Sequence, residues 1–150
     1  MHFPKSETYI QSLCFFLQPQ IGAYYGAELC VVDLDSNTLS DLLLVSAPLH
    51  NEGDQEGKVF VYTFMASQVI YIQVLKGIPG KRGRFGMTLA SPADLNRDGK
   101  MDVVVGAPLE DNGQGSIYIF NGRNADIAPT HSQVRKKRMT TFYCHSDFIL

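Results

Sequence analysis

Residues 94–108 read DLNRDGKMDVVVGAP, and residues 33–48 read DLDSNTLSDLLLVSAP. In both stretches, oxygen-bearing side chains occur at alternate positions and precede a short apolar run that ends in Ala-Pro. The neighbouring segments recur too. YYGAEL at 24–29 corresponds to RFGMTL at 84–89, and Pro48 corresponds to Pro108, in both cases sixty residues later. A fixed period of this kind predicts a repeat architecture.

The segments between these landmarks have the pattern of β-strands. VFVYTF at 59–64 alternates regularly, and VIYIQVL at 69–75 is rich in β-branched and aromatic residues. No stretch from 21 to 133 sustains a helical period without a glycine or proline. Four short antiparallel strands per repeat are typical of a β-propeller blade, so we predict an all-β fold of about two blades. The predicted strands lie near 24–32, 42–47, 58–64 and 69–75 in the first unit, and near 84–91, 103–107 and 116–120 in the second.

The repeat pattern divides the chain into four segments. We expect a first unit at 19–76 and a second, incomplete unit at 77–133, in which three strands precede the loss of the pattern. Residues 1–18 and 134–150 are expected to be unrelated tails. SLCFFLQ at 12–18 can be encoded by a tract resembling a splice acceptor, and QVRKKR at 133–138 by one resembling a donor. Our hypothesis is that both tails derive from introns.

Composition argues against several classes of function. A net charge of −2 gives no electrostatic reason to expect nucleic-acid binding. The three cysteines, Cys14, Cys30 and Cys144, lack C-x-x-C spacing, and their odd number does not fit a closed disulfide framework. No apolar run is long enough to span a bilayer, and SLCFFL is too short for a secretory signal. Neither H-E-x-x-H nor G-x-S-x-G nor a phosphate loop occurs, so we do not expect an enzyme.

The two acidic stretches have the donor set of calcium sites, because calcium takes six to eight oxygens from carboxylates, carbonyls and water. Numbering each loop from its first aspartate, side-chain oxygens fall at positions 1, 3, 5 and 9, and a backbone carbonyl is expected to bind at position 7. The ligands predicted for the first loop are Asp33, Asp35, Asn37, the carbonyl of Leu39, and Asp41. Those predicted for the second are Asp94, Asn96, Asp98, the carbonyl of Lys100, and Asp102.

Two other interpretations of these loops deserve comparison. An EF-hand needs a glutamate at position 12 and flanking helices, but position 12 is Leu44 or Val105, inside a predicted strand. An acidic surface turn uses the same residue types, although two matched copies favour a metal site. Gly99 at position 6 suits a positive φ, whereas β-branched Thr38 resists it. We therefore predict weaker calcium binding by the first loop, to be compared in Asp41→Ala and Asp102→Ala variants.

The combined motifs resemble FG-GAP repeats, and QIGAYYGAELCVVDLD and GAPLEDNGQGSIYIFNG resemble the propeller of integrin α subunits, most closely the leukocyte-type subunits that carry an I domain. A glycine beside an aromatic residue permits close backbone approach, and proline cannot donate to a strand ladder and so is expected to end a strand. The motif residues are Tyr25, Gly26, Ala47, Pro48, Phe85, Gly86, Gly106, Ala107 and Pro108.

The resemblance implies a seven-bladed propeller in a cell-surface heterodimer with an integrin β subunit, serving adhesion and signalling. It implies calcium loops that are structural and lie away from ligand, so extracellular ligands are expected to contact parts outside this chain. Two blades would leave both outer sheet faces uncovered, and we expect the isolated chain to associate and calcium to stabilise it. The alternatives are part of an extracellular enzyme resembling glycosylphosphatidylinositol phospholipase D, and a gene-model fragment without function.

Overall fold

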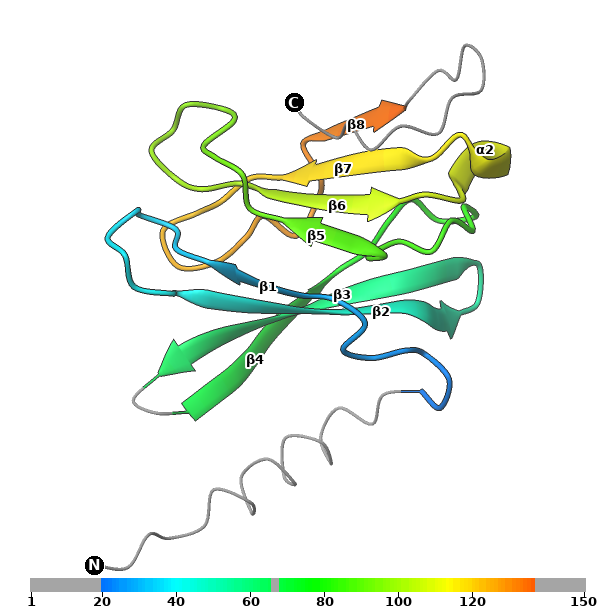
Figure 1. Ribbon diagram of the computed structural model, residues 1–150, viewed down its shortest axis with the longest axis horizontal. Helices are drawn as coiled ribbons and strands as arrows, with labels where there is room; N and C mark the ends of the chain where they lie inside the picture. Colours follow the sequence, from blue (N-terminus) through cyan, green and yellow to red (C-terminus); the bar gives the residue numbers. More distant parts are fainter. Residues whose placement is uncertain (1–19, 66–67, 137–150) are drawn as a thin grey trace, which may run out of the picture.

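The computed structural model describes residues 20–65 and 68–136, which form two antiparallel four-stranded sheets. The first sheet contains β1 (Leu29–Val32), β2 (Leu42–Glu52), β3 (Gln55–Met65) and β4 (Gln68–Leu75), in that order. The second contains β5 (Thr88–Ala90), β6 (Val103–Ala107), β7 (Ser116–Phe120) and β8 (Gln133–Lys136), also in order. A helical turn, α2 (Glu110–Gly113), lies between β6 and β7. Figure 1 shows the sheets as two stacked layers. The predicted all-β fold of four-stranded blades is confirmed.

The expected strands at 24–32 and 84–91 were too long, since β1 begins at Leu29 and β5 at Thr88. Each is preceded by a tight corner. Tyr24 and Arg84 have φ of 56° and 54°, so the chain turns there instead of extending. The turn is closed by the N–H of residue 27 or 87, which donates to the carbonyl of residue 24 or 84 at 3.1 or 3.0 Å. The aromatic-glycine motif is therefore a corner ahead of the strand.

A fourth strand in the second sheet also corrects the expected count of three. β8 pairs with β7 in a register that places Val134 opposite Tyr118. Val134 packs against the core between the sheets. Residues 134–136, expected to belong to an unrelated tail, thus complete the sheet. The intron origin of the tails remains a hypothesis, and residues 1–19 and 137–150 lie outside the described part of the chain.

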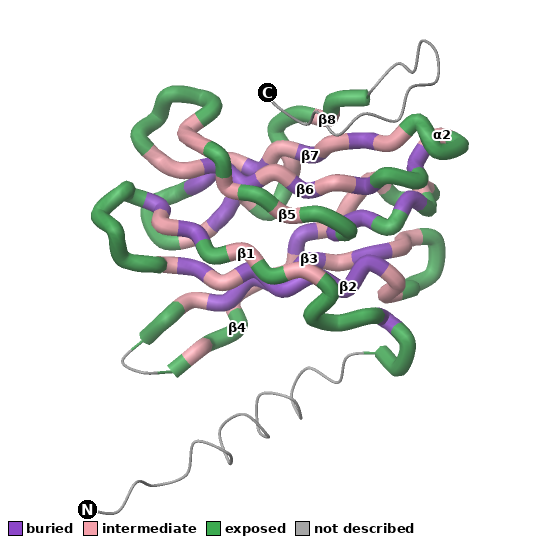
Figure 2. The backbone as a smooth tube through the Cα atoms, in the orientation of Figure 1, coloured by how far each residue is buried: buried purple, intermediate pink, exposed green. Residues whose placement is uncertain are grey.

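One hydrophobic core lies between the sheets, because the alternation of each strand turns one apolar face toward the other sheet. Figure 2 shows buried segments on the facing strands. The first sheet contributes Val32, Leu34, Leu42, Leu44, Val59, Val61 and Leu75. The second contributes Phe85, Val103, Val105, Ala107, Tyr118, Phe120 and Ile127. Phe85 makes edge-to-face contacts with Tyr118 and Phe120, at centroid distances of 5.1 and 6.1 Å.

The aromatic-glycine corner of the second unit comes within contact distance of the first sheet's backbone. A Cβ built on Gly86 would lie 3.0 Å from a methyl of Val59, and one on Gly57 would lie 2.1 Å from the carbonyl oxygen of Phe85. Gly86 also donates its N–H to the carbonyl of Gly106 at 3.0 Å, which ties the corner to β6. The motif glycine therefore has the predicted role of permitting close approach.

The two motif prolines behave differently. Pro108 directly follows β6, as expected for a residue that cannot donate to a ladder. Pro48 lies inside β2, so the expectation that it ends a strand was wrong. The register between β2 and β3 shifts between Ala47 and Asn51, and this irregularity accommodates Pro48. Within the described residues, no helix has the length and apolar character needed to cross a bilayer.

The contact at Gly57 can be tested against its counterpart in the second unit. Gly57 and Gly115 both have positive φ, 86° and 79°, so alanine strains the backbone at either position by roughly 1–2 kcal/mol. At Gly57 the added carbon would also meet the Phe85 backbone, whereas at Gly115 the nearest atom is 3.2 Å away. We expect Gly57→Ala to lower the free energy of unfolding by about 1–3 kcal/mol more than Gly115→Ala, measured by urea denaturation. Equal losses would contradict the close approach of the sheets.

Candidate metal centre

The two acidic loops lie at the same end of the stacked sheets. Residues 33–41 join β1 to β2, and residues 91–102 join β5 to β6 (Figure 1). The loops are in direct contact, because the N–H of Met101 donates to the carbonyl oxygen of Leu34 at 3.0 Å. Leu34 is position 2 of the first loop, and Met101 is position 8 of the second. The two candidate sites are therefore neighbours joined through the backbone.

Side-chain oxygens of the first loop accept hydrogen bonds from its own backbone. Asp33 accepts from the N–H groups at positions 5 and 6, at 3.1 and 2.7 Å. Asp35 accepts from position 5 at 3.3 Å, and Asn37 accepts from position 7 at 2.8 Å. Asp41 closes the loop by accepting from position 2 at 2.7 Å. The four predicted side-chain ligands thus fix the loop's shape and turn inward.

The second loop repeats this network position by position. Asp94 accepts from positions 5 and 6 at 3.1 and 2.7 Å, and additionally from position 4 at 2.7 Å. Asn96 accepts from position 5 at 3.0 Å, and Asp98 accepts from position 7 at 2.9 Å. Asp102 accepts from position 2 at 2.9 Å. Two sequences that share little beyond the leucine at position 2 and their oxygen-bearing positions therefore fold into the same loop.

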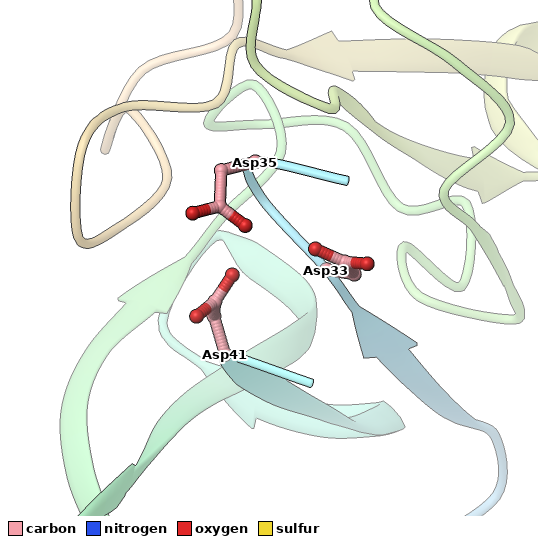
Figure 3. Close-up of side chains that lie close together, drawn as sticks. All are labelled: Asp33, Asp35 and Asp41. Carbon is pink, nitrogen blue, oxygen red and sulfur yellow. The ribbon is translucent and has the colours of Figure 1, made fainter. Parts of the chain in front are cut away.

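The carboxylates of the first loop converge. One oxygen from each of Asp33, Asp35 and Asp41 lies within 4.8 Å of the other two, and Figure 3 shows the three carboxylates facing one another. No other group of three acidic, histidine or cysteine side chains in 20–65 and 68–136 meets this distance. The second loop's predicted ligands therefore share the backbone network but do not form an equally close acidic group.

Asp102 explains part of this difference. Its carboxylate is fully buried, and the oxygen that does not bind Leu95 accepts the N–H of Gly122 at 2.9 Å. The amide of Asn96 also donates to Asp98 at 2.8 Å. In the second loop, protein donors therefore bind one oxygen of Asp102 and one oxygen of Asp98. The carboxylate of Asp102 thus connects its loop to Gly122 after β7, whereas Asp41 is linked to β3 through its backbone carbonyl, which accepts from Thr63 and Phe64.

The donor set fits a hard divalent cation. An ionised carboxylate offers about four acceptor sites, so the N–H bonds to Asp33, Asp35 and Asp41 leave capacity toward the centre. Three carboxylates at this separation repel one another unless a positive charge lies among them. Oxygen ligands in this number suit calcium rather than zinc, which takes nitrogen and sulfur. The carbonyls of Leu39 and Lys100 remain predicted ligands.

The backbone of the second loop favours an ionised carboxylate at position 1. Desolvation acts to raise the pKa of Asp94, but backbone N–H donors from Gly99, Asp98, Arg97 and Asn96 together outweigh it and hold the pKa below its usual value. A carboxylate that accepts several N–H groups is stabilised in its charged form. Asp94 is therefore suited to remain an anion, as a cation ligand must.

Both loops place non-glycine residues in the left-handed region. Position 4 has φ of 59° at Ser36 and 64° at Arg97, and position 6 has φ of 74° at Thr38 and 82° at Gly99. Thr38 adopts this conformation although its branched side chain disfavours it. The N–H of Thr38 donates to Asp33 and that of the next residue, Leu39, donates to Asn37, so the turn at Thr38 lies within the loop's hydrogen-bond network. The predicted order of calcium affinities stays a prediction.

A second polar cluster was not found from the sequence. Tyr118 donates to buried Glu110 at 2.5 Å, and burial, followed by this hydrogen bond, raises the pKa of the tyrosine. Lys81 pairs with Asp111 at 2.7 Å. These partners are distant in the sequence or part of no motif, so no spacing rule could identify them.

Cys30 is a half-buried free thiol whose pKa is raised by burial and then by Glu28.

Comparison with known proteins places the repeats in context. Residues 85–120 match the family model of the FG-GAP repeat. The chain is 44% identical to integrin alpha-11 of Homo sapiens over 135 residues, which cover 89% of the chain and 11% of that protein. It is 41% identical to integrin alpha-2 of Mus musculus over 117 residues, covering 76% of the chain and 10% of that protein. Integrin alpha-E of Homo sapiens is 40% identical over 123 residues, covering 76% of the chain and 10% of that protein.

The chain spans about a tenth of the length of these curated relatives. The match to human integrin alpha-11 is longer than the stretch 19–133, so it extends into at least one of the segments expected to be unrelated tails. The similarity to FG-GAP repeats and to integrin α subunits, inferred from the motifs, is confirmed. The choice among subtypes stays a prediction.

An exchange of residue type between Thr38 and Gly99, both at position 6, tests the strain at Thr38. Glycine at position 38 relieves a left-handed conformation that costs roughly 1–2 kcal/mol in other residues, partly offset by the greater flexibility of the unfolded chain. We expect Thr38→Gly to raise the free energy of unfolding by up to about 1 kcal/mol and to tighten calcium binding by the first loop. Gly99→Thr should do the opposite in the second loop. Calorimetric titration and urea denaturation measure both quantities. A loss of stability in Thr38→Gly, or a gain in Gly99→Thr, would contradict the explanation.

Proposed function

The chain carries FG-GAP repeats of the integrin α-subunit family, and from this premise we propose that it forms a calcium-stabilised structural part of an integrin α-subunit head. Its two sheets would serve as two adjacent blades of the α-subunit propeller. The whole receptor would act at the cell surface, as a heterodimer with an integrin β subunit, in cell adhesion and signalling. The role of this segment is structural and non-enzymatic.

The observation that carries the calcium assignment is the congruence of the two loops. The same hydrogen bonds link the same loop positions in both, although the residues at positions 4, 6, 7 and 8 differ. Backbone hydrogen bonding alone explains acceptors at positions 1, 3, 5 and 9, but it does not require three aspartates among them in each loop. A cation-binding role does, because these are the groups that reach the centre of the loop.

The position of the loops determines what calcium would do. Each loop connects two paired strands, and the loops contact each other through Leu34 and Met101. A cation in the first loop would hold β1 and β2 together and fix the backbone to which the second loop is bonded. Calcium would therefore stiffen the junction between blades, and extracellular ligands would contact parts outside these repeats.

Similarity to integrin α subunits over most of the chain favours this function over the phospholipase alternative. That alternative depends on a separate histidine- and aspartate-rich catalytic domain. The described residues include only one close acidic group, and it contains no histidine. Nothing observed among residues 20–65 and 68–136 specifically favours an enzymatic role.

Removing two carboxylates from the first loop tests the function. Calcium bound only by the folded chain at a hundred times its Kd would add about 2.7 kcal/mol to stability. We expect calcium, compared with EDTA, to raise the unfolding temperature of the wild type. The increase should be clearly smaller for the double variant Asp33→Asn, Asp35→Asn, because only the second loop would remain. Differential scanning calorimetry provides the measurement.

Asp54→Asn is the matched control, because Asp54 is an exposed acid in the turn between β2 and β3, outside both loops. It should keep the full calcium effect. The double variant Asp94→Asn, Asp98→Asn reports separately on the second loop. An unfolding temperature indifferent to calcium in the wild type, or equally sensitive in every variant, would refute the calcium-stabilised role.

A further inference from the structure

One stretch of chain, residues 76–87, connects the two sheets, and we call it the linker. It leaves β4, the last strand of the first sheet, and enters β5, the first strand of the second. The turn between β2 and β3 and the α2 segment lie at the opposite end of the stacked sheets from the acidic loops (Figure 1). The contacts of the linker show that it is held between these two features.

The linker is bonded to the first sheet at the turn between β2 and β3. The N–H of Gly80 donates to the carbonyl of Asp54 at 3.1 Å. The N–H of Arg84 donates to the carboxylate of Glu56 at 3.3 Å. Both acceptors lie in or directly after the turn. One side of the linker is therefore fixed to the first sheet through its backbone.

The other side of the linker packs against the α2 segment of the second sheet. The carbonyl of Gly83 accepts the N–H of Leu109 at 3.1 Å. A Cβ built on Gly83 would lie 2.0 Å from the Cγ of Glu110 and 2.7 Å from its backbone nitrogen. The side-chain stem of Glu110 thus presses on the linker at a point where only glycine fits.

Glu110 also belongs to a buried chain of hydrogen bonds that returns to the linker. The hydroxyl of Tyr118 donates to the carboxyl of Glu110 at 2.5 Å and accepts the N–H of Ile78 at 3.4 Å. Tyr118 is fully buried, and Glu110 is 2% exposed. The chain runs from the linker through β7 to α2. The pair therefore contacts the linker twice, through Tyr118 at Ile78 and through Glu110 at Gly83.

The first unit lacks this pair. In the alignment of the two units, His50 corresponds to Glu110, and Phe60 corresponds to Tyr118. The rings of His50 and Phe60 are in contact, at a centroid distance of 6.3 Å. Phenylalanine has no hydroxyl, so it can neither donate to residue 50 nor accept from a linker. The buried pair is a property of the second unit, and the repeat fold as such does not require it.

We propose that Glu110 and Tyr118 form a latch that fastens the linker, and with it one end of the junction between the sheets, independently of the acidic loops. The other end of the junction is joined by the bond from Met101 to Leu34. The junction therefore has two separate fastenings. Loosening one frees its own end and leaves the other closed, so the sheets can pivot about the end that remains fastened. This inference does not depend on calcium or on receptor function.

The latch depends on the hydroxyl of Tyr118 because of how Glu110 is bonded. The second carboxyl oxygen of Glu110 is buried and makes no described hydrogen bond, so the Tyr118 hydroxyl is the described partner of this side chain. Without the hydroxyl, a buried carboxyl would be left unpaired, which is costly. The carboxyl reduces this cost by turning toward water, and the stem that packs on Gly83 moves with it. Losing one hydroxyl therefore releases the linker.

Amide hydrogen exchange of the full chain, followed by NMR at a constant calcium concentration, tests the latch. Ile78 and Leu109 report on the linker, and Met101 reports on the contact between the acidic loops. In Tyr118→Phe, the amides of Ile78 and Leu109 should exchange at least about tenfold faster than in the wild type, because the linker opens locally. The amide of Met101 should keep its rate.

Tyr71→Phe is the matched control, because Tyr71 is a tyrosine of β4 that is 39% exposed and whose hydroxyl makes no described hydrogen bond. It should leave all three rates unchanged. Glu110→Gln keeps an oxygen that can accept from Tyr118, so it should accelerate the same two amides less than Tyr118→Phe does. The double variant Tyr118→Phe, Glu110→Gln should be no faster than Tyr118→Phe alone, since the two residues act as one unit.

Circular dichroism establishes that each variant is folded before exchange is compared. Unchanged rates at Ile78 and Leu109 in Tyr118→Phe would overturn the proposal. Equal acceleration of Met101 would overturn it as well, because the pair would then contribute only to overall stability. If Tyr118→Phe does not fold, Glu110→Gln decides in its place: faster exchange confined to Ile78 and Leu109 supports the latch, and any other pattern overturns it.

Discussion

The structure depends on the backbone contact between the aromatic-glycine corner of the second unit and the first sheet. Gly57 lies against the Phe85 carbonyl at a separation that leaves no room for a side chain, and Gly86 lies close to a methyl of Val59. This approach buries the ring of Phe85 and closes one core over both sheets. The contact gives each sheet an apolar face buried against the other, so it joins the two sheets into one folded body.

The acidic loops extend this junction at one end. The carboxylate of Asp41 accepts the N–H of Leu34, and the carbonyl of Leu34 accepts the N–H of Met101 in the second loop. Asp102 is bonded on both oxygens and reaches the segment after β7. The loops are thus both candidate cation sites and part of the connection between sheets. The two loops are therefore linked to each other by a backbone hydrogen bond at the junction.

Several features were predictable from the sequence because they follow from local rules. Alternation placed the strands predicted at 58–64 and 69–75 to within a few residues, whereas the strand predicted at 42–47 extends to Glu52. The positions of the oxygen atoms gave two loops with the same hydrogen bonds. The strands near 24–32 and 84–91 were predicted too long because their apolar composition conceals a corner at Tyr24 and Arg84. β8 was missed because it is short, basic and mostly exposed, so its composition does not indicate a strand. Its strand conformation comes from its pairing with β7.

By itself, the sequence determined the repeat, the fold class and the residues of the two loops, since periodicity and residue type are local properties of the chain. Only the tertiary structure decided which loop gathers its carboxylates, that the loops touch, and that Glu110 meets Tyr118. Phe85 and Tyr25 occupy equivalent positions in the two repeats, and only the tertiary structure shows that Phe85 is buried and Tyr25 is exposed. The physical reason is that burial and convergence depend on which sheet lies opposite a residue, and no local pattern specifies that neighbour.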